Sequence, residues 1–187
     1  MSGARSLTDH FLIAMPAMDD PNFFRSVTLV CQHDDDGAMG LVVNREADFS
    51  FGEVLGQLGF EAKDPALATR PVLAGGPVQP ERGFVLHDDP RDWHSTLRMG
   101  NGLAVTTSRD ILEAVAKGEG PANLLMTLGY AGWGAGQLEA ELAANSWLTV
   151  PADPAVLFRT PLAERWQAAA RSLGVDISRL ADYSGRA

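Results

Sequence analysis

The residues best suited to metal or thiol chemistry lie in the run Cys31-Gln32-His33-Asp34-Asp35-Asp36. Alternate residues of a strand share a face, so Cys31 and His33 are expected on one side of it. A lone Cys–His pair falls short of zinc's usual ligand count, and the acidic run lacks the spaced oxygens of a calcium loop. The segment is therefore interpreted as a solvated hairpin tip, and no metal site is predicted.

Cys31 by itself leaves two interpretations open. A neighbouring His33 or Arg25 could lower the pKa of its thiol and permit redox or covalent chemistry. A free cysteine in a strand is more commonly a buried, inert side chain. Moderate reactivity at best is expected.

Ser108-Arg109-Asp110 offers a hydroxyl, a cation and a carboxylate, with His87 elsewhere in the chain. A nucleophile elbow of the form G-x-S-x-G is missing from the sequence. Ser108 and Asp110 are also well placed as the N-cap and first-turn acid of a helix. No catalytic residue is predicted. The alternative kept open is a hydrolytic or thiol-dependent enzyme near Cys31 and Ser108, with a pocket lined by Cys31, His33, Arg109 and Gln137.

The segment Gly129–Leu142 reads as a strand end, a glycine-studded loop and the start of an amphipathic helix. A loop before a helix can bind phosphate. This one lacks the Lys and hydroxyl of a P-loop, and its glycines do not fit G-x-G-x-x-G. It is therefore interpreted as a packing corner. Tyr130, Trp133 and Gln137 are left as the lining of a neutral or cationic pocket, with Arg109 or the Gly75-Gly76-Pro77 loop at its rim.

The candidate binding residues are polar or aromatic side chains near strand ends, helix starts and glycine-rich loops, where binding sites are usually assembled. The alternative is that they form buried ion pairs and hydrogen bonds that fix loops. The set comprises Arg25, Cys31, His33, Asn44, Arg82, Arg109, Tyr130, Trp133, Gln137 and Glu141.

These residues need a framework of strands and a few helices. Hydrophobic runs and turn residues predict strands over 10–15, 27–31, 39–43, 71–74, 83–87, 103–107, 123–128 and 146–150. Helices are predicted over 51–58, 109–117 and 164–173, and from the end of the glycine loop to Asn145. Ser50 and Glu53 fit a capping box, and Asp36-Gly37 fits a hairpin turn. The pattern indicates an α+β domain with a mixed or largely antiparallel sheet.

Length and charge narrow the function. At 187 residues one domain over 1–187 is expected, with an ordered core over 8–182 and loose termini. The net charge of −9 and the scattered arginines argue against direct nucleic-acid binding. A single cysteine, and the lack of a long apolar run, predict a cytoplasmic protein rather than a membrane protein. No cofactor is predicted.

Six segments carry a resemblance to a known family. They read HFLIAMPAMDDPNFFRSV, CQHDDDGAMGLVVNR, GGPVQPERGFVLH, TTSRDILEAVAKGEGP, LGYAGWGAGQLEAELAANSWL and RWQAAARSLG. Together they resemble the YqgE/AlgH family of bacterial cytoplasmic proteins, from about His10 to the last helix. The resemblance implies one compact α+β domain, whose branched sheet is partly closed into a small barrel and surrounded by helices.

The resemblance implies no particular reaction. The family carries the label of transcriptional regulator through one member linked to alginate production. Where the family is expected to end in Gly-His-Ala, this chain reads Gly185-Arg186-Ala187, so no role of that histidine carries over. The function expected is regulation or binding through a small ligand or a protein partner, with any transcriptional effect indirect.

Overall fold

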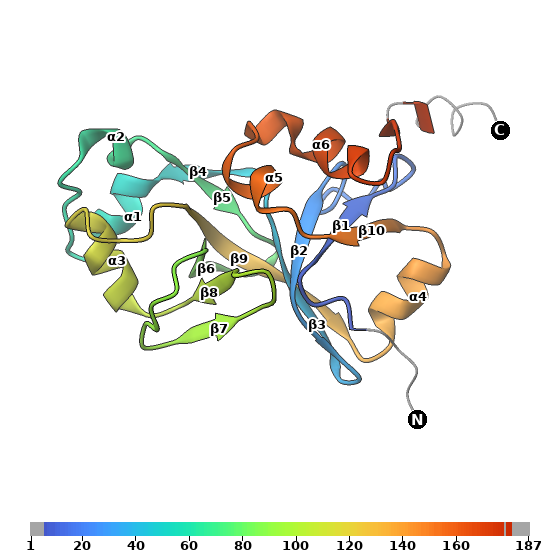
Figure 1. The fold of residues 1–187 in the computed structure, drawn as a ribbon, viewed down its shortest axis with the longest axis horizontal. Coiled ribbons are helices and arrows are strands. Elements are labelled where there is room, and N and C mark those ends of the chain that lie inside the picture. The colour runs from blue at the N-terminus through green and yellow to red at the C-terminus, as the bar shows by residue number, and fades with distance from the viewer. Residues whose placement is uncertain (1–5, 178, 181–187) are drawn as a thin grey trace.

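The computed structural model describes residues 6–177 and 179–180, so Arg186 lies outside the described part of the chain. Its central element is the long strand β9 (Leu124–Gly134), visible in the middle of Figure 1. The first half of β9 lies between β5 (Pro71–Ala74), which is parallel to it, and β6 (Val78–His87), which is antiparallel. Its second half pairs with β3 (Gly37–Val42). The sheet therefore branches at β9.

The remaining strands extend the sheet from this branch point. The main path runs β10-β1-β2-β3-β9-β6-β8-β7, and β4 pairs with β5 off this path. These further strands are β1 (His10–Ala14), β2 (Val27–Asp34), β4 (Glu46–Ser50), β7 (Thr96–Arg98), β8 (Ala104–Thr106) and β10 (Trp147–Pro151). The sheet curls into a half-barrel, which confirms the predicted fold class of a single α+β domain with a branched, largely antiparallel sheet.

Six α-helices of the described chain cover this sheet. They are α1 (Phe51–Gln57), α2 (Pro65–Ala68), α3 (Arg109–Ala116), α4 (Gln137–Ala143), α5 (Pro154–Phe158) and α6 (Arg165–Arg171), with a 3-10 turn over Leu162–Glu164. In Figure 1, α1, α2 and α3 gather at one end of the molecule and α4 lies at the other. None of the helices described is long and apolar enough to cross a membrane.

The hydrophobic core has three parts, each beneath a different group of helices. The largest includes Phe11, Leu29 and Trp166, and lies where α5 and α6 meet the sheet. A second includes Leu55 and Ile111 and lies under α1 and α3. The third includes Trp133, Leu138 and Trp147 and lies under α4. The hydrophobic core is therefore divided among three groups of helices: α5 and α6, α1 and α3, and α4 alone.

Two local signals in the sequence are confirmed. Ser50 and Glu53 form the capping box of α1. The β2–β3 hairpin forms as predicted, although the turn residues are Asp35 and Asp36 and Gly37 already belongs to β3. Both are contacts between residues close in sequence, which is why short-range patterns predict them.

The glycine-studded loop predicted over 129–136 is wrong for most of its length. Strand β9 continues through Gly134, because Val78 pairs with Tyr130 on one side and β3 pairs with residues 131–134 on the other. The interpretation as a packing corner is supported at Gly76 and Gly129. A Cβ on Gly76 would lie 2.1 Å from the Tyr130 carbonyl carbon, and one on Gly129 would lie 2.4 Å from the Gly76 carbonyl oxygen.

Several short elements escape the sequence patterns. Strands β4 and β7 and helices α2 and α5 were not predicted, and β6 begins five residues before the predicted 83–87. Helices α2 and α5 each begin at a proline after an aspartate N-cap, Asp64 and Asp153. Proline disrupts the interior of a helix but is favoured in its first turn, so Pro65 and Pro154 begin these two helices.

Candidate functional site

A cleft of about 490 Å³ opens beside the strands β6, β7 and β8. We call it the β-cleft, defined by its lining residues Met39, Arg82, Phe84, Ser95, Thr96, Leu97, Val105, Thr107 and Tyr130. The lining contains one cation and no Asp or Glu, in a chain that carries 24 acidic residues. Apolar walls with a few polar groups are the usual composition of small-molecule sites. Of the predicted candidates, the β-cleft brings Arg82 and Tyr130 together.

Arg82 is presented to the β-cleft by an irregularity in β6. The pairing of β6 with β9 shifts between Val78 and Gly83, which takes the intervening residues out of the regular ladder. Within this stretch Gln79 adopts a φ of 46°, an uncommon value for a non-glycine residue. Its Oε1 accepts a hydrogen bond of 3.4 Å from Nη1 of Arg82, whose guanidinium lies 5.3 Å from the Phe84 ring centroid. No described carboxylate forms an ion pair with Arg82.

Hydroxyl groups in the β-cleft are also free of protein partners. The Tyr130 ring packs edge-on against Phe84, with centroids 5.8 Å apart, and its hydroxyl makes no hydrogen bond to a described residue. The same holds for the side-chain hydroxyls of Ser95 and Thr107 in the described chain. Together with Arg82, these groups can donate hydrogen bonds to an anionic ligand.

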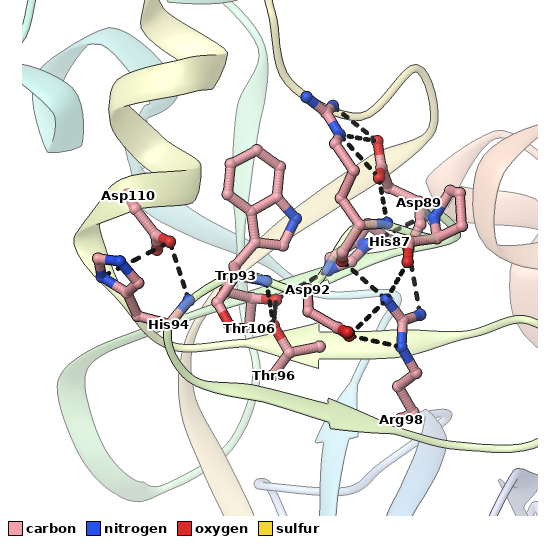
Figure 2. A network of polar contacts seen from close by, with 11 residues as sticks. His87, Asp89, Asp92, Trp93, His94, Thr96, Arg98, Thr106 and Asp110 are labelled. Atoms are coloured by element: carbon pink, nitrogen blue, oxygen red, sulfur yellow. Dashed lines mark hydrogen bonds and ion pairs between the residues drawn. The ribbon is translucent and has the colours of Figure 1, made fainter.

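A chain of hydrogen bonds leads from Asp89 through His87 and Thr106 to Thr96, one of the residues that line the β-cleft (Figure 2). The Asp89 backbone N–H donates to Nδ1 of His87, so the proton of the neutral ring is on Nε2. That nitrogen donates to Thr106 Oγ1 at 2.8 Å, which lies 2.9 Å from Thr96 Oγ1. Burial, the largest effect, lowers the pKa of His87. His87 is therefore a neutral structural group whose two nitrogens are both used.

Ser108, Asp110 and His94 do not form a hydrolytic relay. The Ser108 hydroxyl donates to Asp110 Oδ1 and accepts from the Ser95 backbone N–H, and makes no side-chain cap bond to α3. Asp110 also accepts from the His94 backbone N–H at 2.8 Å (Figure 2). A serine nucleophile needs a neighbouring base that takes its proton, most often an imidazole, and among the described residues no imidazole or amine is bonded to Ser108.

Cys31 and His33 make no common contact. Cys31 packs in the large core cluster, where burial, followed by the charge of Asp9, raises the pKa of its thiol to about 12. His33 bridges two distant segments, since Nδ1 accepts from the Leu7 backbone N–H and Nε2 donates to Glu139 of α4. A β-bulge lies between Val30 and Gln32. The described residues hold no cluster of His, Cys, Asp or Glu suited to a metal ion.

Trp133, Gln137 and Glu141 meet in what we call the tryptophan cluster, completed by Phe23 and Trp147. Glu141 Oε1 accepts from the indole nitrogens of Trp133 and Trp147, at 3.1 and 3.0 Å. Gln137 donates to the other carboxylate oxygen and accepts from the Gly134 backbone N–H. Phe23 packs edge-on against Trp147, with centroids 5.5 Å apart. The predicted pocket of Tyr130, Trp133 and Gln137 therefore does not form, because Tyr130 and Trp133 point to opposite faces of β9.

Arg25 belongs to the loop between β1 and β2, and Asn44, from the connection between β3 and β4, bonds to the end of that loop. Asn44 donates to the Arg25 carbonyl and accepts from the Val27 backbone N–H, both at 2.9 Å. Arg25 has a φ of 53°, and its guanidinium lies over the rings of Phe24 and Trp166. Arg45, which was not among the candidates, donates to two carbonyls of the same loop. These two hydrogen bonds hold the end of the β1–β2 loop in place, which explains Asn44 as a structural residue.

Arg109 lies at a second hollow, an apolar groove of about 460 Å³ under α1 and α3. It donates to the Leu58 carbonyl at 2.6 Å and lies over the Phe60 ring. Unlike the β-cleft, this groove has a carboxylate, Glu81, in its lining. The structure therefore separates Arg109 from Cys31, His33 and Gln137, which were expected to share a pocket with it.

Sequence reasoning missed most of the β-cleft. Met39, Phe84, Ser95 and Thr107 come from four separate segments, and none stands in a motif. The one signal in the sequence was the pair of polar residues Thr106 and Thr107 at the end of the strand predicted over 103–107, of which Thr107 lines the β-cleft. The meeting of these segments depends on the curl of the sheet, which no local pattern encodes.

Comparison with known proteins gives a consistent result. A family model described as AlgH-like matches residues 11–178. A UPF0301 protein of Stenotrophomonas maltophilia is 61% identical over 180 residues, covering 96% of both chains. One of Xanthomonas axonopodis pv. citri is 61% identical over 181 residues, covering 97% of this chain and 96% of its own.

Two solved structures have the same fold. The solution structure of AlgH from Pseudomonas aeruginosa is 53% identical, has a TM-score of 0.80, and covers 96% of this chain and 95% of its own. A Corynebacterium diphtheriae protein at 20% identity has a TM-score of 0.75, covers 97% of this chain and 94% of its own, and so supports the fold alone. The chain belongs to the AlgH-like family.

Proposed function

We propose that this protein binds a small anionic ligand with an apolar or aromatic body in the β-cleft and does not catalyse a reaction on it. The observation that carries the proposal is the lining itself. Arg82 has no carboxylate partner among the described residues, and no acid lines the cleft, although the whole chain has a net charge of −9. A lone cation on an apolar wall favours an anion that also presents a hydrophobic surface.

The non-catalytic part rests on where the reactive side chains lie. Cys31 is buried, His33 and His87 have protein partners on both ring nitrogens, and Ser108 donates to Asp110. Turnover of p-nitrophenyl acetate that is lost in Ser108→Ala would contradict this part and favour the hydrolytic alternative. We expect equal background rates for the wild type and the variant.

We further propose that the protein is cytoplasmic, that it regulates through this ligand or a protein partner, and that any effect on transcription is indirect. Its single cysteine fits a reducing compartment. Its acidic balance opposes binding to phosphate backbones. A tight, sequence-selective gel shift at physiological salt would contradict the indirect mode.

Binding in the β-cleft is tested with a matched pair of dyes. The anionic dye is 8-anilinonaphthalene-1-sulfonate, and the neutral control is N-phenyl-1-naphthylamine; both gain fluorescence in apolar surroundings. Arg82→Gln removes the charge but keeps a polar side chain. We expect it to weaken binding of the anionic dye about tenfold, equivalent to one charge-assisted hydrogen bond, and to leave the neutral dye unchanged.

Arg109→Gln is the matched control, because Arg109 lines the other hollow. It should leave the affinity of both dyes unchanged. If Arg109→Gln weakens the anionic dye and Arg82→Gln does not, the groove binds the anion and the assignment to the β-cleft is wrong.

A further inference from the structure

A third, smaller cavity of about 200 Å³ lies where α6 and its preceding turn meet β5 and β9. Two arginines, Arg70 and Arg165, line it together with apolar side chains that include Phe51, Leu73 and Leu125. No Asp or Glu is part of the lining. Two cations thus share a small apolar cavity without a carboxylate between them.

Arg165 is the unusual member of the pair, because it is only 7% exposed. Its Nε donates to the Thr160 carbonyl at 3.1 Å and its Nη1 donates to the Val43 carbonyl. Nη2 makes no hydrogen bond to a described residue, and no described carboxylate pairs with the guanidinium. Buried arginines are rare unless they are paired with an opposite charge.

Arg70 brings a second positive charge to the same cavity. Its Nη2 donates to the Leu124 carbonyl at 3.0 Å, and its Nε and Nη1 have no acceptor among the described residues. Burial and the nearby Arg70 charge both lower the pKa of Arg165, in that order of size. Carbonyl oxygens hold the two side chains in place, but they do not neutralise them.

We infer that this cavity binds an oxyanion, a phosphate or carboxylate group, clamped between Arg70 and Arg165. The free N–H groups of both guanidiniums are the donors, and planar guanidinium forks suit the oxygens of such groups. The cavity is smaller than the usual site for a whole drug-sized ligand. It therefore takes a free ion or the anionic end group of a larger molecule.

The site is independent of the β-cleft, since the two hollows share no lining residue. An ion held there would connect α6, through Arg165, to the segment before β5, through Arg70. Binding to the folded state alone would then stabilise it by RT ln(1 + c/Kd), where c is the ion concentration, so the unfolding temperature would rise with the logarithm of c once c exceeds Kd.

The test follows the arginine Nε–Hε signals of the full chain by NMR, during titration with inorganic phosphate at constant ionic strength. We expect the Arg70 and Arg165 signals to shift together and saturate at millimolar phosphate, on the order of a 1 mM dissociation constant. Arg70→Gln should raise that constant at least about tenfold. Arg70 is exposed, so this variant is expected to fold.

Three further arms sharpen the result. Arg171→Gln, an exposed arginine of the same helix, and Arg82→Gln in the β-cleft should both leave phosphate binding unchanged. Acetate and methyl phosphate in place of phosphate distinguish a carboxylate site from a phosphate site, and a free ion from an end group. Arg165→Lys keeps the charge but loses the fork, and should weaken binding if the chain folds.

The proposal is overturned by either of two outcomes. One is that neither arginine signal shows a saturable shift with any of the three anions. The other is that the shift saturates equally in the wild type and Arg70→Gln. Because Arg82 plays no part, failure here leaves the proposal for the β-cleft intact, and failure of the dye experiment leaves this one intact.

Discussion

The tryptophan cluster and the β-cleft lie on opposite faces of the same strand, β9, and use similar side chains differently. Trp133 and Glu141 on one face bond to each other, whereas Tyr130 and Arg82 on the other have polar atoms without a protein acceptor or counter-ion among the described residues. Both faces looked equally suited to binding in the sequence. The difference is whether a neighbouring element supplies the hydrogen-bond partner.

On the Trp133 face of β9, helix α4 supplies the hydrogen-bond partner. The chain turns back after Gly134, so that Gln137 and Glu141, one helical turn apart, both reach the strand they have just left. On the second face no described helix covers Arg82 and Tyr130, which line a hollow instead. Five predictions test this contrast between side chains that have protein partners in the fold and those with polar atoms that have none among the described residues.

The largest effect is expected at Cys31, a satisfied side chain. A thiol pKa of about 12 in place of 9.0 leaves roughly a thousandfold less thiolate near neutral pH, and burial slows access further. Labelling by 5,5′-dithiobis(2-nitrobenzoic acid) at pH 8 should therefore be at least about 10³ slower in the native protein than in urea. A native rate within a factor of about ten of the unfolded rate would show that Cys31 is reactive.

Glu141→Leu should give the largest loss of stability among the variants considered. It leaves the indole N–H groups of the buried Trp133 and Trp147 without their acceptor, at about 1–3 kcal/mol for each orphaned donor. We expect the free energy of unfolding in urea to fall by about 3 kcal/mol. Glu141→Gln keeps a carbonyl oxygen and should recover part of it.

Tyr130→Phe is the matched control on the free face of β9. Removing a hydroxyl that has no protein partner should change the free energy of unfolding by less than about 0.5 kcal/mol. Equal losses in Glu141→Leu and Tyr130→Phe would remove the contrast between the two faces.

His87 predicts a pH dependence of stability. Its pKa is lowered in the folded state, so below the ordinary value of 6.5 the unfolded chain binds a proton that the folded chain resists. The His87 contribution is therefore full above pH 6.5 and is lost as the pH falls from there towards the folded pKa. The slope can reach about 1.4 kcal/mol per pH unit.

This contribution is measured as the difference between the wild type and His87→Gln in urea unfolding from pH 7.5 to 5. The other histidines cancel in that difference. Parallel loss of stability in the two proteins would contradict the description of His87 as a buried, neutral ring with both nitrogens hydrogen-bonded. An NMR signal from a protonated His87 ring at pH 6 would contradict it as well.

The smallest effect is expected for the stability of Arg82→Gln. Arg82 is exposed and holds only a 3.4 Å hydrogen bond to Gln79 and a contact with Phe84, so the change should stay within about 0.5 kcal/mol. Thermal unfolding checks this. A loss of several kcal/mol would place Arg82 with the structural side chains and weaken the case for the β-cleft.

Short-range chemistry could be predicted from the sequence because its partners are neighbours in the chain. Ser50 and Glu53 are three residues apart and do form a capping box, and Asn145, at a φ of 59°, ends α4 as expected. The α+β class follows from the periodicity of hydrophobic residues, which requires one buried face on each element. The resemblance to the YqgE/AlgH family, confirmed by the AlgH-like match, added the branched, curled sheet.

Long-range chemistry was decided only by the tertiary structure. The sequence alone identified Tyr130, Trp133 and Arg82 as candidates, but not that Trp133 is bonded to Glu141 while Tyr130 and Arg82 line a cleft. The segment 129–134 resembled a loop because its glycines weaken any strand signal, yet pairing with β6 at Tyr130 and with β3 over residues 131–134 makes it strand. Arg70 and Arg165 lie 95 residues apart in sequence and share a cavity only because folding brings the first residue of α6 and the turn before it next to β5 and β9. A side chain's availability depends on the partners that folding brings to it, and those partners are not local.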